Sequence, residues 1–224
     1  MEKFLEFWDA WGELTASLIC VLTCVAIVVI GILLNKKGKS SSKRITFGAI
    51  CLALSVVLNM LPAWELPNGG SITLGRLVPL LIYSYIFGAP SGFVLGFTYG
   101  LLDFIMEPVF VHPIQFLLDY PVAFCCVGLA GLFQKNNVLS KFSVYLGAAL
   151  AGIMRFLSST ISGTVYWGTP WAGSVAYNSA ILVDMAICIV IIFLLFRSKS
   201  FVNYVNSKKP NYVATKENPD DIKL

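Results

Sequence analysis

Charged residues are scarce in this sequence, which has 12% Asp, Glu, Lys and Arg and a single histidine. Soluble domains contain about 25% charged residues, whereas this chain is 57% hydrophobic. The composition therefore excludes an ordinary soluble domain and predicts an integral membrane protein. The net charge of +4 does not indicate nucleic-acid binding, because the basic residues cluster in loops between apolar stretches.

Motifs of catalysis, nucleotide binding and metal binding are also missing. The sequence has no P-loop GxxxxGK(S/T), no HExxH and no GxSxG. Its six cysteines lie in apolar segments without metal-ligand spacing, so we interpret them as small buried hydrophobic residues. We therefore predict that the chain is not an enzyme and binds no metal or cofactor, and that any ATP hydrolysis comes from a partner.

Seven apolar stretches approach the length that crosses a bilayer, which is about 20 residues and at the low end about 17. We predict membrane-spanning helices at 15–34, 45–62, 73–88, 91–107, 114–133, 142–165 and 177–196. The predicted fold class is an all-α integral membrane bundle with seven spans. The short stretch FGAPSG at 87–92 joins the third and fourth spans tightly.

Basic residues alternate from one predicted loop to the next. The loops NKKGKSSSKR (35–44) and QKNNVLSK (134–141) and the C-terminal tail are basic, whereas the intervening loops and the acidic N-terminus carry one lysine, Lys3. Since Lys and Arg are in excess on the cytoplasmic side of membrane proteins, we predict an N-terminus outside the cell and a cytoplasmic C-terminus.

Small residues recur at helical spacing on two predicted spans. The fourth span carries Gly92, Gly96 and Gly100, and the second carries Ala49 and Ala53. Such residues let membrane helices approach closely. Packing within the bundle is the first interpretation of both patterns, and a docking face for another membrane subunit is the alternative for the two alanines.

Ionisable side chains are placed mainly toward the predicted outer ends of the spans: Arg76, Asp103, Asp119, Arg155 and Asp184. An ionisable group within a span is costly and usually faces a cavity or a partner. Asp119 therefore either borders a pocket that opens outward or pairs with Arg155.

Aromatic residues gather at the same level: Trp64, Tyr120, Tyr166, Trp167, Trp171 and Tyr177. Trp and Tyr at this level are typical of the interfacial belt. Rings beside a carboxylate also suit a flat organic cation, which they attract through stacking and cation–π contacts. We interpret His112 as a helix-entry residue before Pro113, with ligand contact as the alternative.

Several segments together resemble the thiamine-specific S-component family (ThiT, YuaJ-type) of energy-coupling factor (ECF) transporters. They are GSITLG (70–75), HPIQFLLDYPVAF (112–124), GLAG (128–131), RFLSSTISGTVYWG (155–168) and AYNSA (176–180). The resemblance implies a six-helix substrate-binding domain at 45–197. An extra N-terminal transmembrane helix with a basic cytoplasmic loop would then occupy 1–44, and a polar cytoplasmic tail 198–224.

This resemblance implies the substrate-binding subunit of a vitamin importer in a bacterial cell membrane. Such a subunit captures thiamine or a related compound outside, while an ECF transmembrane T component and two cytoplasmic ATPase subunits drive uptake. An AxxxA motif on the first family helix contacts the T component, and Ala49 and Ala53 match it. A self-sufficient ion-coupled transporter of a small cationic metabolite remains the alternative.

The resemblance also implies roles for particular residues. Asp119 binds the cationic portion of the ligand, Trp167 supplies a ring wall and Asn178 hydrogen-bonds the ligand. Tyr120 and Tyr177 lie beside them and are expected to line the pocket.

Two positions depart from the family pattern. Ser159 stands where family members usually have a histidine, and Gly173 stands where a tyrosine is expected. The departures predict either weaker thiamine binding or a smaller or differently shaped ligand, such as a precursor or a pyrimidine fragment.

Overall fold

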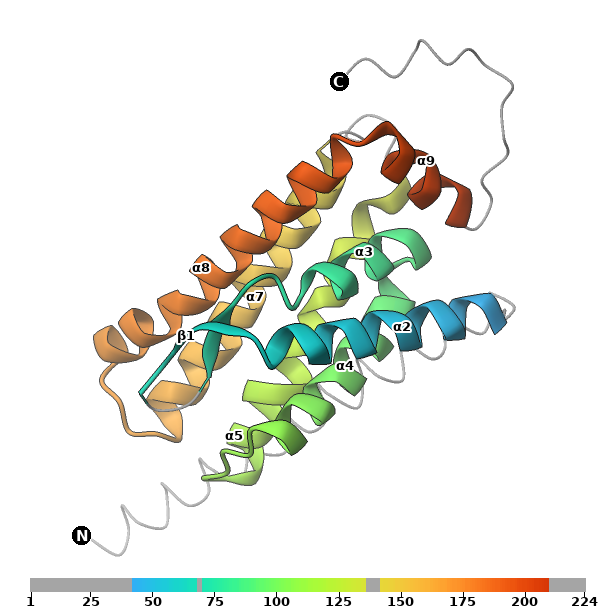
Figure 1. The fold of residues 1–224 in the computed structure, drawn as a ribbon. Coiled ribbons are helices and arrows are strands. Elements are labelled where there is room, and N and C mark those ends of the chain that lie inside the picture. The colour runs from blue at the N-terminus through green and yellow to red at the C-terminus, as the bar shows by residue number, and fades with distance from the viewer. Residues whose placement is uncertain (1–41, 68–69, 136–141, 210–224) are drawn as a thin grey trace, which may run out of the picture.

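The structure is a computed structural model that describes residues 42–67, 70–135 and 142–209, and helices make up most of it (Figure 1). Five helical segments are long and apolar enough to cross a membrane: Ser42–Asn59 (α2), Ala89–Met106 (α4), Pro113–Phe133, Ser143–Val165 (α7) and Trp171–Phe196 (α8). The chain is therefore a multi-pass membrane protein. The predicted span at 15–34 lies outside the described residues, so the count of seven stays a prediction.

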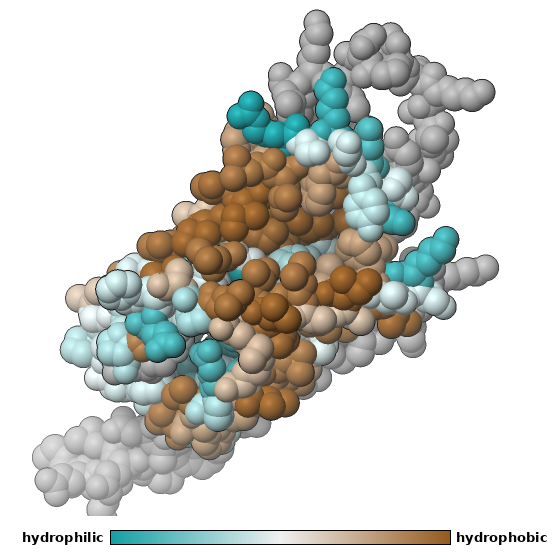
Figure 2. Space-filling model, viewed as in Figure 1, coloured by the Kyte–Doolittle hydropathy of each residue, from teal (hydrophilic) through white to brown (hydrophobic). Residues whose placement is uncertain are grey.

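Apolar side chains cover the middle of the bundle, and polar side chains gather toward its ends (Figure 2). Many large hydrophobic residues of the described bundle are well exposed, including Ile105 at 72% and Leu194 at 60%. A soluble protein rarely exposes so continuous an apolar surface, whereas contact with lipid requires one. The surface thus agrees with the composition.

The third predicted span is wrong in extent. Its helix, Val78–Phe87 (α3), has ten residues, which span about 15 Å, or half of the hydrocarbon core. The helix cannot begin earlier because Gly75 turns the chain with φ +93°. Residues Val78 to Ile86 are all buried, so the other helices enclose α3.

A small antiparallel hairpin, Pro62–Glu65 (β1) and Ser71–Thr73 (β2), joins α2 to α3 (Figure 1). Glu65 pairs with Ser71, and Pro62 pairs with Thr73. The all-α expectation missed this hairpin, because two strands of four and three residues carry little sequence signal. It brings Ser71 and Thr73 to the end of the bundle where α2 ends.

The fifth span changes its helical geometry along its length. It consists of Pro113–Leu117 (α5), the π-helical turn Leu118–Val122 (η1), Ala123–Cys125 (α6) and the 3-10 segment Cys126–Lys135 (η2). Pro121 lies inside η1 and has no amide hydrogen to donate, which disrupts regular α-helical bonding. Single π turns are frequent at functional sites, and this one carries Asp119.

The glycines of α4 pack against this fifth span. A Cβ atom on Gly96 would lie 2.2 Å from the carbonyl oxygen of Phe124, and one on Gly100 would lie 2.6 Å from that of Tyr120. Real Cβ atoms do not approach so closely, so the two backbones are in direct contact. The predicted packing role of the glycine pattern is confirmed.

The alanine pattern lies elsewhere on the molecule. Ala49 and Ala53 are both exposed on α2, whereas the neighbouring Gly48 is buried. The AxxxA face therefore takes no part in packing within the described bundle. Its docking role stays a prediction.

The last helix, Lys199–Lys208 (α9), lies across the end of the bundle opposite the hairpin (Figure 1). Its buried residue is Val205, and the Phe201 ring packs edge-on against Phe196 with centroids 5.5 Å apart. Ser198 caps its first turn by accepting a hydrogen bond from the Phe201 amide. The predicted polar tail thus begins with a packed helix.

Candidate substrate-binding site

A cavity of about 370 Å³ lies within the bundle, lined by residues of the hairpin, α4, the fifth span, α7 and α8. Its volume lies in the range of small-molecule sites, about 300–1,000 Å³. All six residues predicted to bind substrate line it: Asp119, Tyr120, Ser159, Trp167, Tyr177 and Asn178. The structure thus brings them to one place, while their contact with a ligand stays a prediction.

Asp119 is held by two neutral donors. Nε2 of Gln115 donates to its Oδ2 at 2.8 Å, and the Ser162 hydroxyl donates to the same oxygen at 2.9 Å. Both bonds leave the negative charge uncompensated, because neither partner is cationic. The carboxylate therefore lies beside the cavity and is not turned toward lipid.

Gln115 is the positioning residue that sequence reasoning missed. It is 1% exposed, and besides Asp119 it donates to the carbonyl of Val109 and accepts from the Val111 amide. The signal was present, because residues four apart on a helix lie on the same face. Gln115 thereby ties Asp119 to the loop that precedes α5.

Aromatic rings form part of the cavity wall. Trp167 is 40% exposed and lies after the C-terminus of α7, whereas Tyr120 is buried in η1. The Tyr120 hydroxyl donates to the Glu107 carbonyl at 2.7 Å and accepts from the Val109 amide at 3.1 Å. Since that hydroxyl has two backbone partners, Tyr120 offers the cavity mainly its ring.

The other outer aromatic residues lie outside the cavity lining. Trp64 and Trp171 are 68% and 56% exposed, as expected for an interfacial belt. The Tyr166 ring stacks on His112, with centroids 4.9 Å apart. His112 caps α5 by accepting a hydrogen bond from the Ile114 amide, so its interpretation as a helix-entry residue is confirmed.

Asn178 is fixed by its own surroundings. Its Nδ2 donates to the carbonyls of Ser174 at 3.0 Å and Ser159 at 3.3 Å. We therefore expect the amide oxygen to be the group that a ligand meets. Ser159 and Gly173, the two departures from the family pattern, both line the cavity, where their small side chains leave room.

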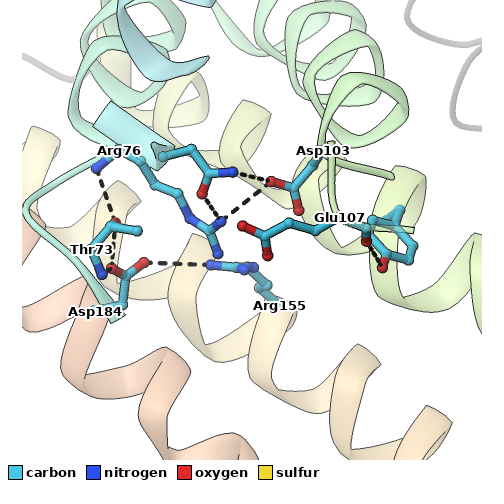
Figure 3. A network of polar contacts seen from close by, with 8 residues as sticks. Thr73, Arg76, Asp103, Glu107, Arg155 and Asp184 are labelled. Carbon is cyan, nitrogen blue, oxygen red and sulfur yellow. Dashed lines mark hydrogen bonds and ion pairs between the residues drawn. The ribbon is translucent and has the colours of Figure 1, made fainter. Parts of the chain in front are cut away.

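Two buried ion pairs form another part of the lining (Figure 3). Arg76 lies 3.3 Å from Asp103, and Asn59 bridges the two by accepting from Arg76 and donating to Asp103. Arg155 lies 3.6 Å from Asp184. The open alternative of an Asp119–Arg155 ion pair is not what the structure shows.

Asp184 connects α8 to the hairpin. Its Oδ1 accepts hydrogen bonds from the Thr73 amide and hydroxyl, each at 2.9 Å (Figure 3). Both guanidiniums lie near the buried Phe124 ring, whose centroid is 5.6 Å from the Arg76 Cζ and 4.4 Å from the Arg155 Cζ. Contact with a ring face stabilises buried cations, so Phe124 supports both arginines.

Glu107 adds a carboxylate at the C-terminal end of α4. It lines the cavity and points toward the arginines in Figure 3. Partial burial, with repulsion from the Asp103 carboxylate, raises the pKa of Glu107. From the sequence, ionisable residues were placed near the outer ends of the spans, but Glu107 was not assigned to the substrate site.

Comparisons with known proteins point to one family. The sequence profile described as "Thiamine transporter protein (Thia_YuaJ)" matches residues 45–203. The thiamine transporter ThiT of Bacillus subtilis (strain 168) is 31% identical over 168 residues, covering 66% of this chain and 87% of the relative. ThiT of Lacticaseibacillus paracasei is also 31% identical, over 54% of this chain and 66% of the relative.

A solved structure of ThiT from Listeria monocytogenes has a similar fold. It superposes with a TM-score of 0.59 and 21% sequence identity over 71% of this chain and 97% of the other. At this identity the likeness concerns the fold alone. The superposition covers 97% of the ThiT chain, so nearly all of that fold has a counterpart in this protein.

Proposed function

This chain belongs to the thiamine transporter protein (Thia_YuaJ) family, and from this premise we propose that it captures thiamine or a closely related cation for uptake. The family consists of transporters, so the chain is not an enzyme. The observation that carries the proposal is the Asp119 carboxylate in a cavity of ligand size, held by two uncharged donors.

The geometry around Asp119 suits a flat cation. The hydrogen bonds from Gln115 and Ser162 both end on Oδ2 of the carboxylate, and Trp167 is a further hydrogen-bond partner of Asp119. The rings of Tyr120, Trp167 and Tyr177 line the same cavity. A thiazolium ring offers both a positive charge for the carboxylate and a flat face for stacking.

The energy for transport is proposed to come from other subunits. We propose that an ECF T component docks on the exposed Ala49 and Ala53 of α2 and that two cytoplasmic ATPases drive the cycle. The proposed orientation places the hairpin and cavity outside and the basic α9 inside, in agreement with the positive-inside rule. The vitamin would then be captured from the extracellular side of the bacterial cell membrane.

The distribution of acidic residues disfavours the ion-coupled alternative. In the described ranges the acidic residues are Glu65, Asp103, Glu107, Asp119 and Asp184. Four of them line the single cavity discussed here, and Glu65 lies on the hairpin. In an ion-coupled transporter, a carboxylate must exchange its proton or ion alternately with each side of the membrane. That requires a polar path to the α9 side as well, and no described carboxylate lies near α9.

The direct test is ligand identification with the purified full chain. We expect thiamine to bind and to quench tryptophan fluorescence, because Trp167 lines the cavity. The pyrimidine precursor, the thiazole precursor and the thiamine phosphates are then tested as competitors of thiamine, which ranks the ligands by affinity. If none of these compounds quenches the fluorescence or co-purifies with the protein, the proposal is wrong.

A further inference from the structure

The ion pair between Arg155 and Asp184 is incompletely satisfied. Arg155 is 7% exposed and Asp184 is 2% exposed. Their closest atoms, Nη1 and Oδ2, are 3.6 Å apart, which is longer than a hydrogen bond. Nε and Nη1 of Arg155 and Oδ2 of Asp184 make no hydrogen bond to any residue in the described ranges.

In the neighbouring pair, Nε of Arg76 also lacks a hydrogen bond, but no oxygen of its partner Asp103 is buried and unpaired. Arg76 donates from Nη1 to Asn59 and also contacts Asp103 at 3.3 Å. Asp184 in turn has its Oδ1 occupied by Thr73, so only its Oδ2 lacks a partner. A buried polar group without a hydrogen bond costs about 1–3 kcal/mol. Of the two described ion pairs in the lining, Arg155–Asp184 is therefore the one in which both the donor and the acceptor lack hydrogen bonds that a ligand group could complete.

The two partners together select the chemistry of that group. A carbonyl accepts from Arg155 but cannot satisfy Asp184, and an ammonium group donates to Asp184 but cannot satisfy Arg155. An anion meets repulsion from Asp184, Asp103 and Glu107, which line the same cavity. A hydroxyl group both accepts and donates, and it carries no charge.

We propose that Arg155 and Asp184 form a subsite for an alcohol group of the ligand, which accepts from the guanidinium and donates to Oδ2 of Asp184. This inference rests on the proposed function, in which Asp119 holds the cationic ring. The same ligand then needs a hydroxyl on a side arm that reaches the ion pair, as the hydroxyethyl arm of thiamine provides.

The test compares three ligands on the wild-type full chain by calorimetry or fluorescence quenching. They are thiamine, the analogue whose hydroxyl is replaced by hydrogen, and thiamine monophosphate. Hydrogen bonds to charged groups predict that thiamine binds about tenfold or more tightly than the deoxy analogue. The monophosphate is expected to bind no more tightly than thiamine.

Two variants assign the effect to the pair. In Arg155→Met the preference for thiamine over the deoxy analogue should disappear, because the donors are lost while the apolar stem remains. The matched control is Arg197→Met, which removes an exposed guanidinium outside the cavity lining and should retain the preference. Thermal unfolding of each purified variant establishes whether it is folded, and the wild-type comparison stands even if a variant does not fold.

The outcomes separate the two proposals. Equal affinity for thiamine and its deoxy analogue overturns the alcohol subsite and leaves the proposed function intact. Much tighter binding of the monophosphate also overturns it, in favour of an anion site. If neither thiamine nor the deoxy analogue binds, the proposed function fails and the subsite fails with it.

Discussion

Asp119 is the residue whose charge the proposed site depends on. Gln115 and Ser162 orient it without neutralising it, so we expect a cationic ligand to supply the missing positive charge. Replacing one partner of a close, poorly hydrated charge pair costs about 2–5 kcal/mol. The size of that loss makes Asp119 the first position to test.

We predict that Asp119→Asn weakens thiamine binding at least about thirtyfold while the protein stays folded. The amide keeps the shape of the carboxyl group and can still accept from Gln115 or Ser162. Equilibrium titration of the purified variant measures the loss, and thermal unfolding reports the fold. Affinity equal to that of the wild type would remove Asp119 from the site.

We expect Glu107 to make the binding of a cation sensitive to pH, because it lines the cavity. Its pKa is raised by partial burial and by Asp103, with Arg76 opposing. Glu107 therefore takes up a proton at a higher pH than an ordinary glutamate does, and its attraction for a cation is lost as the pH falls. The charge is fully present only above the raised pKa.

We predict that thiamine affinity falls less steeply with decreasing pH in Glu107→Gln than in the wild type, because the variant lacks a carboxylate whose pKa is raised. Dissociation constants measured as a function of pH for the wild type and the variant provide the comparison. Glu65→Gln is the control, because Glu65 lies on the hairpin outside the cavity lining. Parallel pH profiles for the wild type and Glu107→Gln would contradict this role.

The sequence predicted the site best where a residue type has only one plausible environment inside a membrane. An aspartate within an apolar span needs a polar partner or a cavity, and Asp119 has both. It was weaker for Arg155 and Asp184, because five ionisable residues at a similar depth allow several pairings. The choice of Asp184 as the partner of Arg155 depends on how α7 and α8 pack, which no local pattern encodes.

At the scale of elements, the contact between α4 and the fifth span positions the site. Gly96 and Gly100 lie against the carbonyl groups of Phe124 and Tyr120, and Asp119 lies in the π turn beside that contact. Forcing the two backbones apart would therefore move the carboxylate as well as loosen the bundle. Stability and ligand affinity should change together.

We predict that Gly96→Ala lowers the free energy of unfolding by about 1–3 kcal/mol, as overpacking does, and weakens thiamine binding. The added Cβ would lie 2.2 Å from a backbone oxygen, which cannot move without its helix. Thermal unfolding in detergent and a ligand titration measure the two effects. Leu101→Ala on the exposed side of α4 is the control, and equal losses in both variants would contradict the packing argument.

Span boundaries were predictable where a long apolar run continues without interruption. The spans at α2, α4 and α7, and the irregular fifth span at Pro113–Phe133, all lie close to their predicted ranges. The run at 73–88 was equally apolar but contains Gly75, and its helix shrank to ten buried residues. Hydropathy cannot distinguish a short helix enclosed by other helices from one that meets lipid.

On the scale of the whole molecule, capture and transport should be separable. The cavity is lined by the hairpin, α4, the fifth span, α7 and α8, whereas Ala49 and Ala53 lie on the exposed face of α2. Small residues on a lipid-facing helix allow another helix to approach closely. A bulky side chain there should block docking without reaching the cavity.

We predict that Ala53→Trp reduces thiamine uptake by cells to background while the purified protein binds thiamine as the wild type does. Uptake of labelled thiamine and equilibrium titration measure the two properties. Val190→Trp, at a 57% exposed position on α8, is the control and should transport normally. Normal uptake by Ala53→Trp would refute the docking assignment.

The two buried ion pairs have a consequence for energetics across the bilayer. Arg76 and Arg155 are balanced by Asp103 and Asp184, and these four are the buried charged side chains of the described residues. A monovalent vitamin would cancel Asp119, which leaves Glu107 as the remaining acidic group among the described residues of the cavity lining. A voltage acts on net charge, at about 2.3 kcal/mol per elementary charge for each 100 mV. Moving the two ion pairs through the lipid would therefore neither gain from the cell's resting voltage nor work against it, and the protonation of Glu107 would set the net charge on which the voltage acts.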